Sequence, residues 1–320
     1  MKQIVQTTIH LKTLTVIVLL LNGIIGYAQN SAPIATDDTY RVSYNVTRTI
    51  TATNGVLSND SDVDGSASLQ VRTTPITDVS SGNLVLNTDG SFSYTPNTNF
   101  IGTDSFTYQV CDDGLPSELI SQFNFDTPIL TDATVGPNAT GINPNAVPIE
   151  CGLHIPSGST GGNVGLDFII PNTGGIFNFT SFEAAFEYRD QESQASLIEG
   201  GNFRLFHVRA NDLGMSITVI NGTTGLQQTY TLDLGSFLSG NNPYSVIYNE
   251  VTGEVIYDAN GTVTTYPVAP PFSPLDVSLA TALTVGRQWD NGGRNFASFC
   301  SILMYDRSVL CDTATVNLDI

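Results

Sequence analysis

Lysine is almost absent from this chain, and this scarcity of basic residues limits its partners. The two lysines, Lys2 and Lys12, stand at the N-terminus, and residues 29–320 contain nine arginines against 30 acidic residues, a formal charge of −21. Nucleic acid and anionic lipid are bound by clustered basic residues. The composition therefore excludes a nucleic-acid partner, whereas so acidic a surface favours solubility and the uptake of cations, including calcium.

Histidine is also scarce, which limits the chemistry available. Beyond residue 28 only His154 and His207 occur, far apart in the sequence, and no G-x-S-x-G motif is present. A histidine-based metal site and a Ser-His-Asp triad are therefore poorly supported. The chain contains a single tryptophan, Trp289.

Long apolar runs are missing after the N-terminus. Residues 14–25 are apolar, follow two lysines and precede small residues that end at Ala28. This is the pattern of a secretory signal peptide, cleaved after Ala28, and the run is too short to favour a membrane span. We expect a secreted or cell-surface protein without membrane insertion.

Helical periodicity is absent from residues 31–118, where short alternating strands follow one another. Residues 39–44, 69–72, 84–86 and 104–110 alternate apolar and polar side chains, with turn residues between them. Such a series predicts an Ig-like β-sandwich.

Two segments 200 residues apart read as the halves of one hairpin. Residues 110–117 form a strand end followed by a Gly/Pro turn, and residues 310–320 alternate as a closing strand. We therefore predict an Ig-like domain of residues 29–118 plus 310–320, interrupted before its last strand by residues 119–309.

The predicted insert is again rich in strands. Hairpin turns are indicated at 251–254 and at 259–262, the second with an Asn-Gly pair. We expect a larger β-sandwich of jelly-roll type.

Four cysteines in an exported protein imply two disulfides, for which three pairings are possible. A nested insert favours Cys111–Cys311 as the outer bridge and Cys151–Cys300 as the inner one.

Four motifs carry a resemblance to a known family. Residues 32–40, 55–60, 89–96 and 100–108 resemble, in order and spacing, the bacterial cadherin-like Ig-fold repeats of large surface and adhesion proteins. The resemblance extends over 32–117 and implies a scaffold domain. The chain departs from the family pattern by placing the final strand at 311–320.

The insert carries a second resemblance. Residues 123–126, 283–287 and 295–307 look like parts of a laminin-G-like, concanavalin A-like domain, most specifically at Tyr305-Asp306-Arg307. The resemblance implies glycan or protein binding, often with calcium, although glycosidases share the superfamily.

A D-x-D-x-D-G loop contains Asp60, Asp62 and Asp64. Alternating carboxylates can converge on calcium, which requires six to eight oxygen ligands. The loop is not an EF-hand, since Val71 stands where the closing glutamate belongs; the alternative is a solvated acidic turn. Further acids could add ligands at the ends of the sandwich: Asp37, Asp38, Asp104, Asp112 and Asp113.

Glu183 and Glu187 are predicted to share one face of a strand. Laminarinase-like glycosidases place carboxylates at positions i, i+2 and i+4 of a strand, but the middle position here is Ala185. A polar strand that faces a glycan is the alternative to catalysis.

A Gly-rich loop holds Trp289, Asp290, Asn291 and Arg294. The indole could stack on a sugar while its neighbours bond the hydroxyl groups, or Trp289 could pack beneath its own loop.

Together these features predict a secreted, non-catalytic adhesion or carbohydrate-binding protein. Its expected partner is a glycan or surface glycoprotein, with calcium as a possible cofactor. The alternatives are a polysaccharide hydrolase that uses the insert and a structural spacer from a longer repeat protein.

Overall fold

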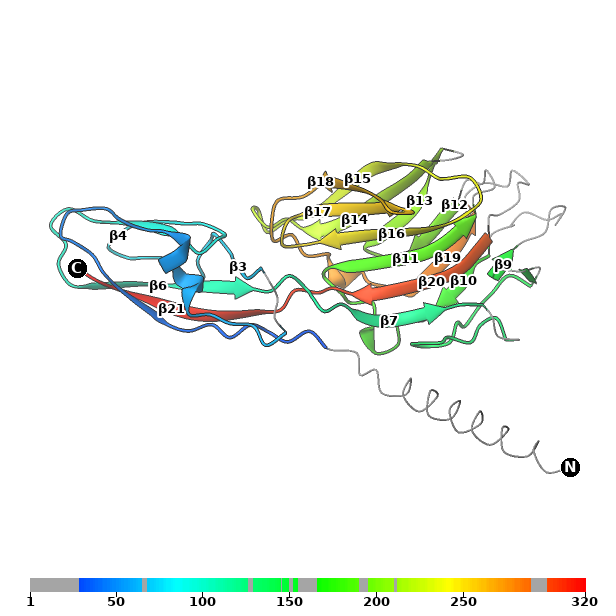
Figure 1. Cartoon of the computed structure of the whole chain (residues 1–320), viewed down its shortest axis with the longest axis horizontal. Helices are drawn as coiled ribbons and strands as arrows, with labels where there is room; N and C mark the ends of the chain where they lie inside the picture. Colours follow the sequence, from blue (N-terminus) through cyan, green and yellow to red (C-terminus); the bar gives the residue numbers. More distant parts are fainter. Residues whose placement is uncertain are drawn as a thin grey trace, which may run out of the picture.

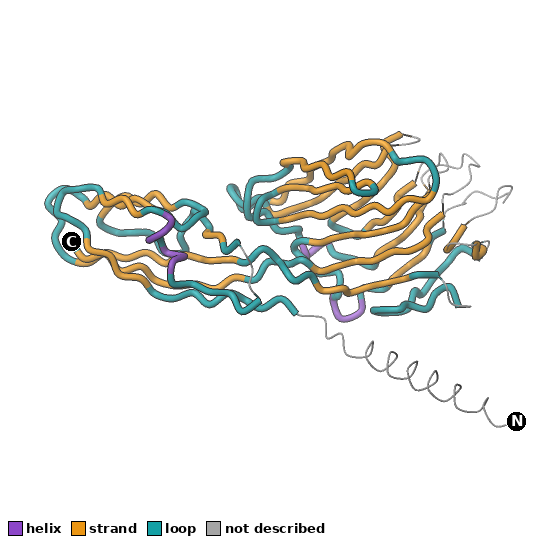
Figure 2. Tube along the Cα trace, viewed as in Figure 1, coloured by secondary structure: helices purple, strands orange, loops and turns teal. Residues whose placement is uncertain are grey.

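The computed structural model describes residues 29–64, 68–125, 129–144, 146–149, 152–154, 166–189, 195–209, 212–288 and 298–320. Within these ranges the chain forms strands and short 3₁₀ turns, arranged as two β-sandwiches placed end to end (Figures 1 and 2). The predicted all-β class is confirmed. The 3₁₀ turns are η1 (Ala52–Asn54), η2 (Val56–Ser58), η3 (Thr173–Gly175) and η4 (Val277–Leu279).

The first sandwich, called here the split sandwich, combines both ends of the described chain. One sheet has the strand order β1 (Asp38–Arg41), β21 (Cys311–Asp319), β6 (Thr103–Cys111), β3 (Gln70–Val71). The other has the order β2 (Arg48–Ile50), β5 (Phe92–Pro96), β4 (Gly82–Leu86). Alternation puts Phe106, Tyr108 and Val110 of β6 into the core between the sheets.

The last strand lies where the two half-motifs predict it. β21 pairs antiparallel with β6 from Cys311 opposite Cys111 to Asp319 opposite Thr103. Its Val316 and Leu318 are buried in the core of the split sandwich. The predicted interruption of an Ig-like sandwich before its last strand is therefore confirmed.

The second sandwich, called here the inserted sandwich, is larger. Its large sheet has the order β18 (Thr262–Pro267), β17 (Glu254–Ala259), β16 (Asn241–Asn249), β11 (Phe182–Arg189), β20 (Ser298–Asp306), β9 (Gly152–His154), β8 (Val147–Ile149), and β7 (Glu118–Phe123) also pairs with β20. Its small sheet has the order β10 (Phe168–Ile170), β19 (Leu283–Gln288), β12 (Ala195–Glu199), β13 (Phe203–Arg209), β14 (Asp212–Ile220), β15 (Gln227–Ser236). The predicted Asn-Gly turn joins β17 to β18, with positive φ at both Asn260 and Gly261.

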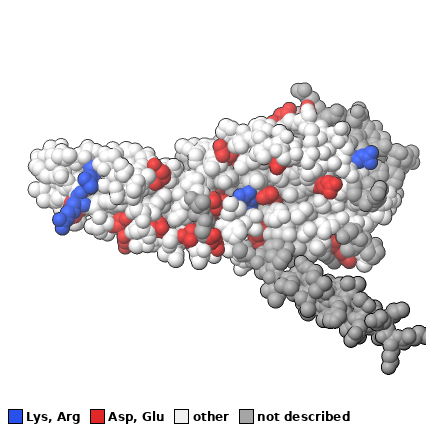
Figure 3. All heavy atoms as spheres, in the orientation of Figure 1, with Lys and Arg blue, Asp and Glu red and all other residues white. Residues whose placement is uncertain are grey.

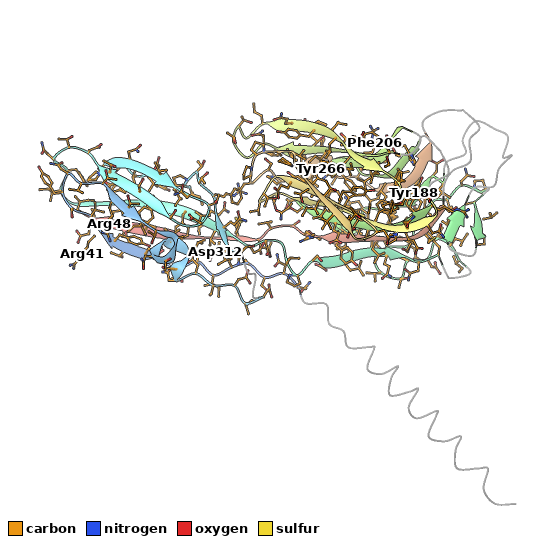
Figure 4. All side chains as sticks on the ribbon, turned by 45° about the horizontal axis from the view of Figure 1, so that its top comes forward. Arg41, Arg48, Tyr188, Phe206, Tyr266 and Asp312 are labelled. Atoms are coloured by element: carbon orange, nitrogen blue, oxygen red, sulfur yellow. A yellow bond between two sulfur atoms is a disulfide. The ribbon has the colours of Figure 1, made fainter. Side chains whose placement is uncertain are left out.

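Aromatic side chains fill the space between these two sheets. β11 turns Phe182, Phe186 and Tyr188 inward, and the Tyr188 hydroxyl lies 2.8 Å from Nε2 of the buried His207. Figure 4 shows Tyr188 among the densely packed side chains of this sandwich. His207 is therefore part of the core and is not exposed to a ligand.

The outer disulfide is also as predicted. Cys111 and Cys311 are bonded at the junction of the sandwiches, beside a small apolar cluster with Val251 and Phe272. Cys300 is buried, but its predicted partner Cys151 lies outside the described residues, and their pairing stays a prediction.

The predicted signal peptide, residues 1–28, lies outside the described residues. Within the part of the chain that the structure describes, no helix is long and apolar enough to cross a membrane.

Candidate functional site

The outer face of the large sheet is the first candidate site. Because side chains alternate along a strand, residues that flank the buried ones must point away from the core. Pairing across the sheet places these outward side chains in rows, such as Ile247–Glu183–Tyr305 and Ser245–Ala185–Leu303. All are partly buried, so they form a semi-exposed surface of carboxylates, hydroxyls, short apolar groups and a tyrosine ring.

The two predicted glutamates lie on this face. Glu183 and Glu187 are four residues apart on β11, with Ala185 between them. Ala185 stands where the laminarinase-like pattern has its middle carboxylate. Glu183 also forms an ion pair with Arg307, whose Nη1 lies 3.3 Å from Oε2. The strand therefore lacks one of the three carboxylates of that pattern, and one of the other two is held by an arginine.

Carboxylates predominate over basic groups on the molecule as seen in Figure 3, which views it as Figure 1 does. On the outer face of the large sheet, Glu254 and Asp258 join the two glutamates of β11. An exposed arginine, Arg189, stands at the end of β11. Such a face offers many hydrogen-bond acceptors for hydroxyl groups.

The predicted tryptophan loop lies outside the described residues. Trp289, Asp290, Asn291 and Arg294 all belong to the segment 289–297. Their role in ligand binding stays a prediction.

The second candidate site is an acidic cluster at the junction end of the split sandwich, formed by Asp38, Asp60, Asp62, Asp112 and Asp312. Figure 4 shows Asp312 toward this end, with Arg41 and Arg48 toward the other. Asp60 accepts hydrogen bonds from the Thr36 amide, at 2.8 Å, and from the Tyr108 hydroxyl, at 2.9 Å. The carboxylates therefore surround the segment that leads into β1.

Burial and mutual repulsion shift the titration of this acidic cluster. Burial, and then the carboxylate of Asp60, raise the pKa of Asp38 to about 7. Burial also raises the pKa of Asp60 and of Asp112, and Asp312 and Asp62 respectively add to these shifts. Hydrogen bonds from neighbouring groups lower these pKa values, but they do not offset burial and the repulsion between the carboxylates.

Two carboxylate oxygens in this cluster are buried without a hydrogen-bond partner: Oδ2 of Asp38, a residue only 9% exposed, and Oδ2 of Asp62. Orphaned anionic oxygens of this kind fit a hard cation such as calcium. Among the described residues, however, no group of three or more His, Cys, Asp or Glu side chains could by itself hold a metal ion.

The other predicted calcium ligands are placed differently. Asp64 accepts a hydrogen bond from the Ser31 amide, and Asp37 accepts one from the Thr315 amide. Asp104 lies at the start of β6, away from the acidic cluster, and accepts from the Ser80 and Ser81 amides. Burial opposes ionisation of Asp104, but these hydrogen bonds outweigh it and lower its pKa. Asp104 therefore acts locally, in holding the loop before β4.

Comparison with protein families accounts for the first part of the chain. Residues 30–121 match the family model described as a bacterial cadherin-like domain. Over these residues the split sandwich is similar to a bacterial cadherin-like domain. The match ends within β7, and β21, the last strand of the split sandwich, lies far outside it in the sequence.

Solved structures resemble the chain only distantly. A botulinum neurotoxin type C structure, from work on its interaction with two ganglioside molecules, has 15% identity, covers 60% of this chain and has a TM-score of 0.39. This chain covers 48% of that structure, about half its length. A carbohydrate-binding module of a Ruminococcus gnavus sialidase, bound to sialyllactose, has 18% identity and a TM-score of 0.33, with 52% of this chain and 91% of the module covered.

A family 18 polysaccharide lyase is similarly remote, with 12% identity and a TM-score of 0.28 over 55% of this chain and 93% of the lyase. Similarities at this level assign no ligand or activity to the protein. No curated protein sequence matches the chain significantly.

The sequence did not predict the roles of three charged residues in these regions. Asp312 joins the acidic cluster of the cadherin-like domain, and its position directly after Cys311 in the second half-motif was the available signal. Arg307 pairs with Glu183 across 124 positions, and Glu250 is buried beside the chain crossing, where it accepts from the Thr180 hydroxyl at 2.6 Å. No local pattern marks Glu250, and the Tyr305-Asp306-Arg307 motif does not indicate that Arg307 pairs with Glu183.

Proposed function

We propose that this protein is a secreted, non-catalytic glycan-binding protein of the cell surface. The inserted sandwich is the binding module, and the cadherin-like domain carries it. One observation supports this most: the outer face of the large sheet presents Glu183, Glu187, Ser245 and Tyr305 in register and partly exposed. Carboxylates and hydroxyls bond sugar hydroxyl groups, and a tyrosine ring packs against the apolar face of a sugar.

Binding without chemistry is favoured by the missing third carboxylate. Ala185 stands between Glu183 and Glu187 on β11, where the laminarinase-like pattern has an acid. Arg307 further engages Glu183, so that this carboxylate is held in an ion pair. We therefore assign both glutamates to ligand contact.

Calcium is proposed as a structural cofactor of the cadherin-like domain. Asp38 and Asp62 would each supply a ligand, with oxygens other than carboxylates completing the coordination, because each has a buried oxygen without a partner and burial raises the pKa of Asp38. The ion would supply the positive charge that these groups lack. It would thereby stiffen the segment that leads into β1.

The test is a panel of immobilised glycans probed with the chain from residue 29, with soluble fractions assayed in parallel for new reducing ends. We expect retention on at least one glycan without product. Release of reducing ends that Glu183→Gln or Glu187→Gln abolishes would instead establish the hydrolase. If no glycan is retained, while calcium raises only the melting temperature, the protein is a spacer.

A further inference from the structure

The chain crosses between the two sandwiches twice within a short distance. It leaves the split sandwich after Cys111, at the end of β6, and returns at Cys311, where β21 begins. The disulfide between these two cysteines spans a sequence separation of 200 residues. The whole inserted sandwich is therefore a closed loop whose two ends are covalently joined at its base.

Buried carboxylates hold the two crossings together. Asp112, fully buried, accepts hydrogen bonds from the Gly114 amide of the outgoing crossing at 2.8 Å and from the Leu310 amide of the returning one at 3.1 Å. Glu250, 4% exposed, accepts from the Val309 amide at 3.2 Å.

Gly114 shows how closely the crossings approach. Its φ is +72°, and a Cβ there would lie 2.2 Å from the carbonyl oxygen of Arg307. The base of the closed loop is thus a packed, cross-linked joint.

The two ends of the described chain lie at opposite ends of the split sandwich. Asn30 reaches the junction, where its side chain donates to Asp112 at 2.9 Å, whereas Ile320 pairs with Gly102 at the far tip. In Figure 1 the inserted sandwich extends beyond the junction, away from the C-terminus. A line from residue 29 to residue 320 therefore runs along the split sandwich alone.

The strands next to these two ends are paired directly. β1 and β21 are parallel neighbours, with Asp38 opposite Val316 and Arg41 opposite Asp319. A pull on the start of β1 and the end of β21 slides parallel strands in opposite directions and stretches their hydrogen bonds together. Side chains add ties between them: Asp312 accepts from the Ala35 amide, and Asp37 accepts from the Thr315 amide.

We propose that the Cys111–Cys311 bridge takes the inserted sandwich out of the path of mechanical tension, so that the binding module stays folded while the scaffold is pulled. Tension on β1 is first borne by its hydrogen bonds to β21. Once these break, the covalent path runs through β6 and the disulfide into β21 and leaves at Ile320 without loading residues 112–310. The bridge has this effect whatever ligand the inserted sandwich binds.

Single-molecule force spectroscopy tests this, with the chain tethered at residues 29 and 320. In oxidising buffer the released length should not exceed about 300 Å, the extended length of the residues outside the bridge. With a reducing agent, the 200-residue separation should add about 700 Å. A release of the longer length in oxidising buffer, or its absence under reduction, would overturn the proposal.

A second measurement does not depend on how reduction affects folding. A protease recognition sequence inserted at the Asn260–Gly261 turn allows the closed loop to be cut at an exposed hairpin. The cut, oxidised chain should hold tension with the same force–extension curve as the uncut chain. The tether should break once the Cys111–Cys311 bridge and the predicted Cys151–Cys300 bridge, which also spans the cut, are reduced. Rupture of the tether upon cutting in oxidising buffer would contradict the assigned path.

Discussion

At the scale of single residues, Asp38 is the carboxylate whose surroundings oppose its charge most clearly. It is 9% exposed, one of its oxygens has no partner, and its pKa is raised to about 7 by burial and by Asp60. Proteins retain such groups where a charge is neutralised by a proton or a bound cation. Asp38 is therefore the residue at which both pH and the proposed calcium ion would act on the cadherin-like domain.

The pH dependence of metal-free stability follows from this pKa. Between the ordinary aspartate value of about 4 and the folded value of about 7, the folded state binds more protons than the unfolded state. Stability is then gained as pH falls through this window and lost as pH rises through it. We expect the Tm in a chelator to be higher at pH 5.5 than at pH 7.5. Thermal denaturation followed by circular dichroism checks this, and the reverse order would contradict the assigned pKa.

Asp38→Asn removes the charge without changing the size of the side chain. We expect it to raise the metal-free Tm at pH 7.5 by a few degrees, because it relieves repulsion from Asp60. It should also abolish the rise in Tm that we expect calcium to cause in the wild type. Asp319→Asn, an exposed acid on β21, is the matched control and should leave both values unchanged. Equal calcium responses in the wild type and Asp38→Asn would exclude Asp38 as a ligand.

At the scale of elements, β21 completes the cadherin-like domain from the far end of the chain. Its Leu318 is fully buried between the sheets, while the neighbouring Asn317 is exposed. We expect Leu318→Ala to lower the free energy of unfolding by about 2–5 kcal/mol, the usual cost of a core cavity. Asn317→Ala should change it by less than about 0.5 kcal/mol. Chemical denaturation measures both, and similar values for the two variants would mean that β21 is not part of this core.

β11 carries the proposed ligand contacts of the inserted sandwich. Glu187→Gln exchanges a charged hydrogen-bond acceptor for a neutral one, and we expect about tenfold weaker glycan binding. Asp233→Asn on β15 of the small sheet is the control and should leave the affinity unchanged. Calorimetric titration of each variant with the glycan measures the two dissociation constants and tests the assignment. An equal loss of affinity in Glu187→Gln and Asp233→Asn would mean that the binding site is not on this face.

Elements with a repeating pattern were predictable, and contacts without one were not. Alternation at 104–110 and 311–320, with a cysteine in each half-motif, is enough to place β6 beside β21, since period-two burial defines which face each strand presents. The guanidinium of Arg72 lies 5.0 Å from the ring centroid of Phe272, and Arg307 contacts Glu183. These pairs depend on how loops fold between distant strands, and no periodicity encodes them.

The Asp60–Asp64 loop shows the same limit within one motif. Its spacing is that of a calcium loop, but the structure turns Asp60 toward Tyr108 and Asp64 toward the Ser31 amide. Partners from other segments decide where each carboxylate points. The sequence pattern identifies the acidic loop, but neither its place near the junction nor the oxygen atoms that remain available to an ion.

At the scale of the whole molecule, a generic scaffold and a specialised insert share one joint. The joint combines the disulfide, the buried carboxylates Asp112 and Glu250, and the stacking of Arg72 on Phe272. This arrangement presents the outer face of the large sheet at a fixed place beyond the scaffold (Figure 1). A protein that holds a surface glycan under tension would benefit from the cross-linked joint and from the fixed placement of this face.

The most direct test of this account is the affinity of the chain for a glycan that it retains, measured for the wild type, Tyr305→Ala and Tyr44→Ala. Tyr305 lies on the outer face of the large sheet, whereas Tyr44 is 47% exposed on the cadherin-like domain. We predict at least tenfold weaker binding for Tyr305→Ala, with its Tm showing that the fold is kept, and wild-type affinity for Tyr44→Ala. Unchanged binding by a folded Tyr305→Ala, or its loss in Tyr44→Ala, would contradict the assignment of glycan binding to this face.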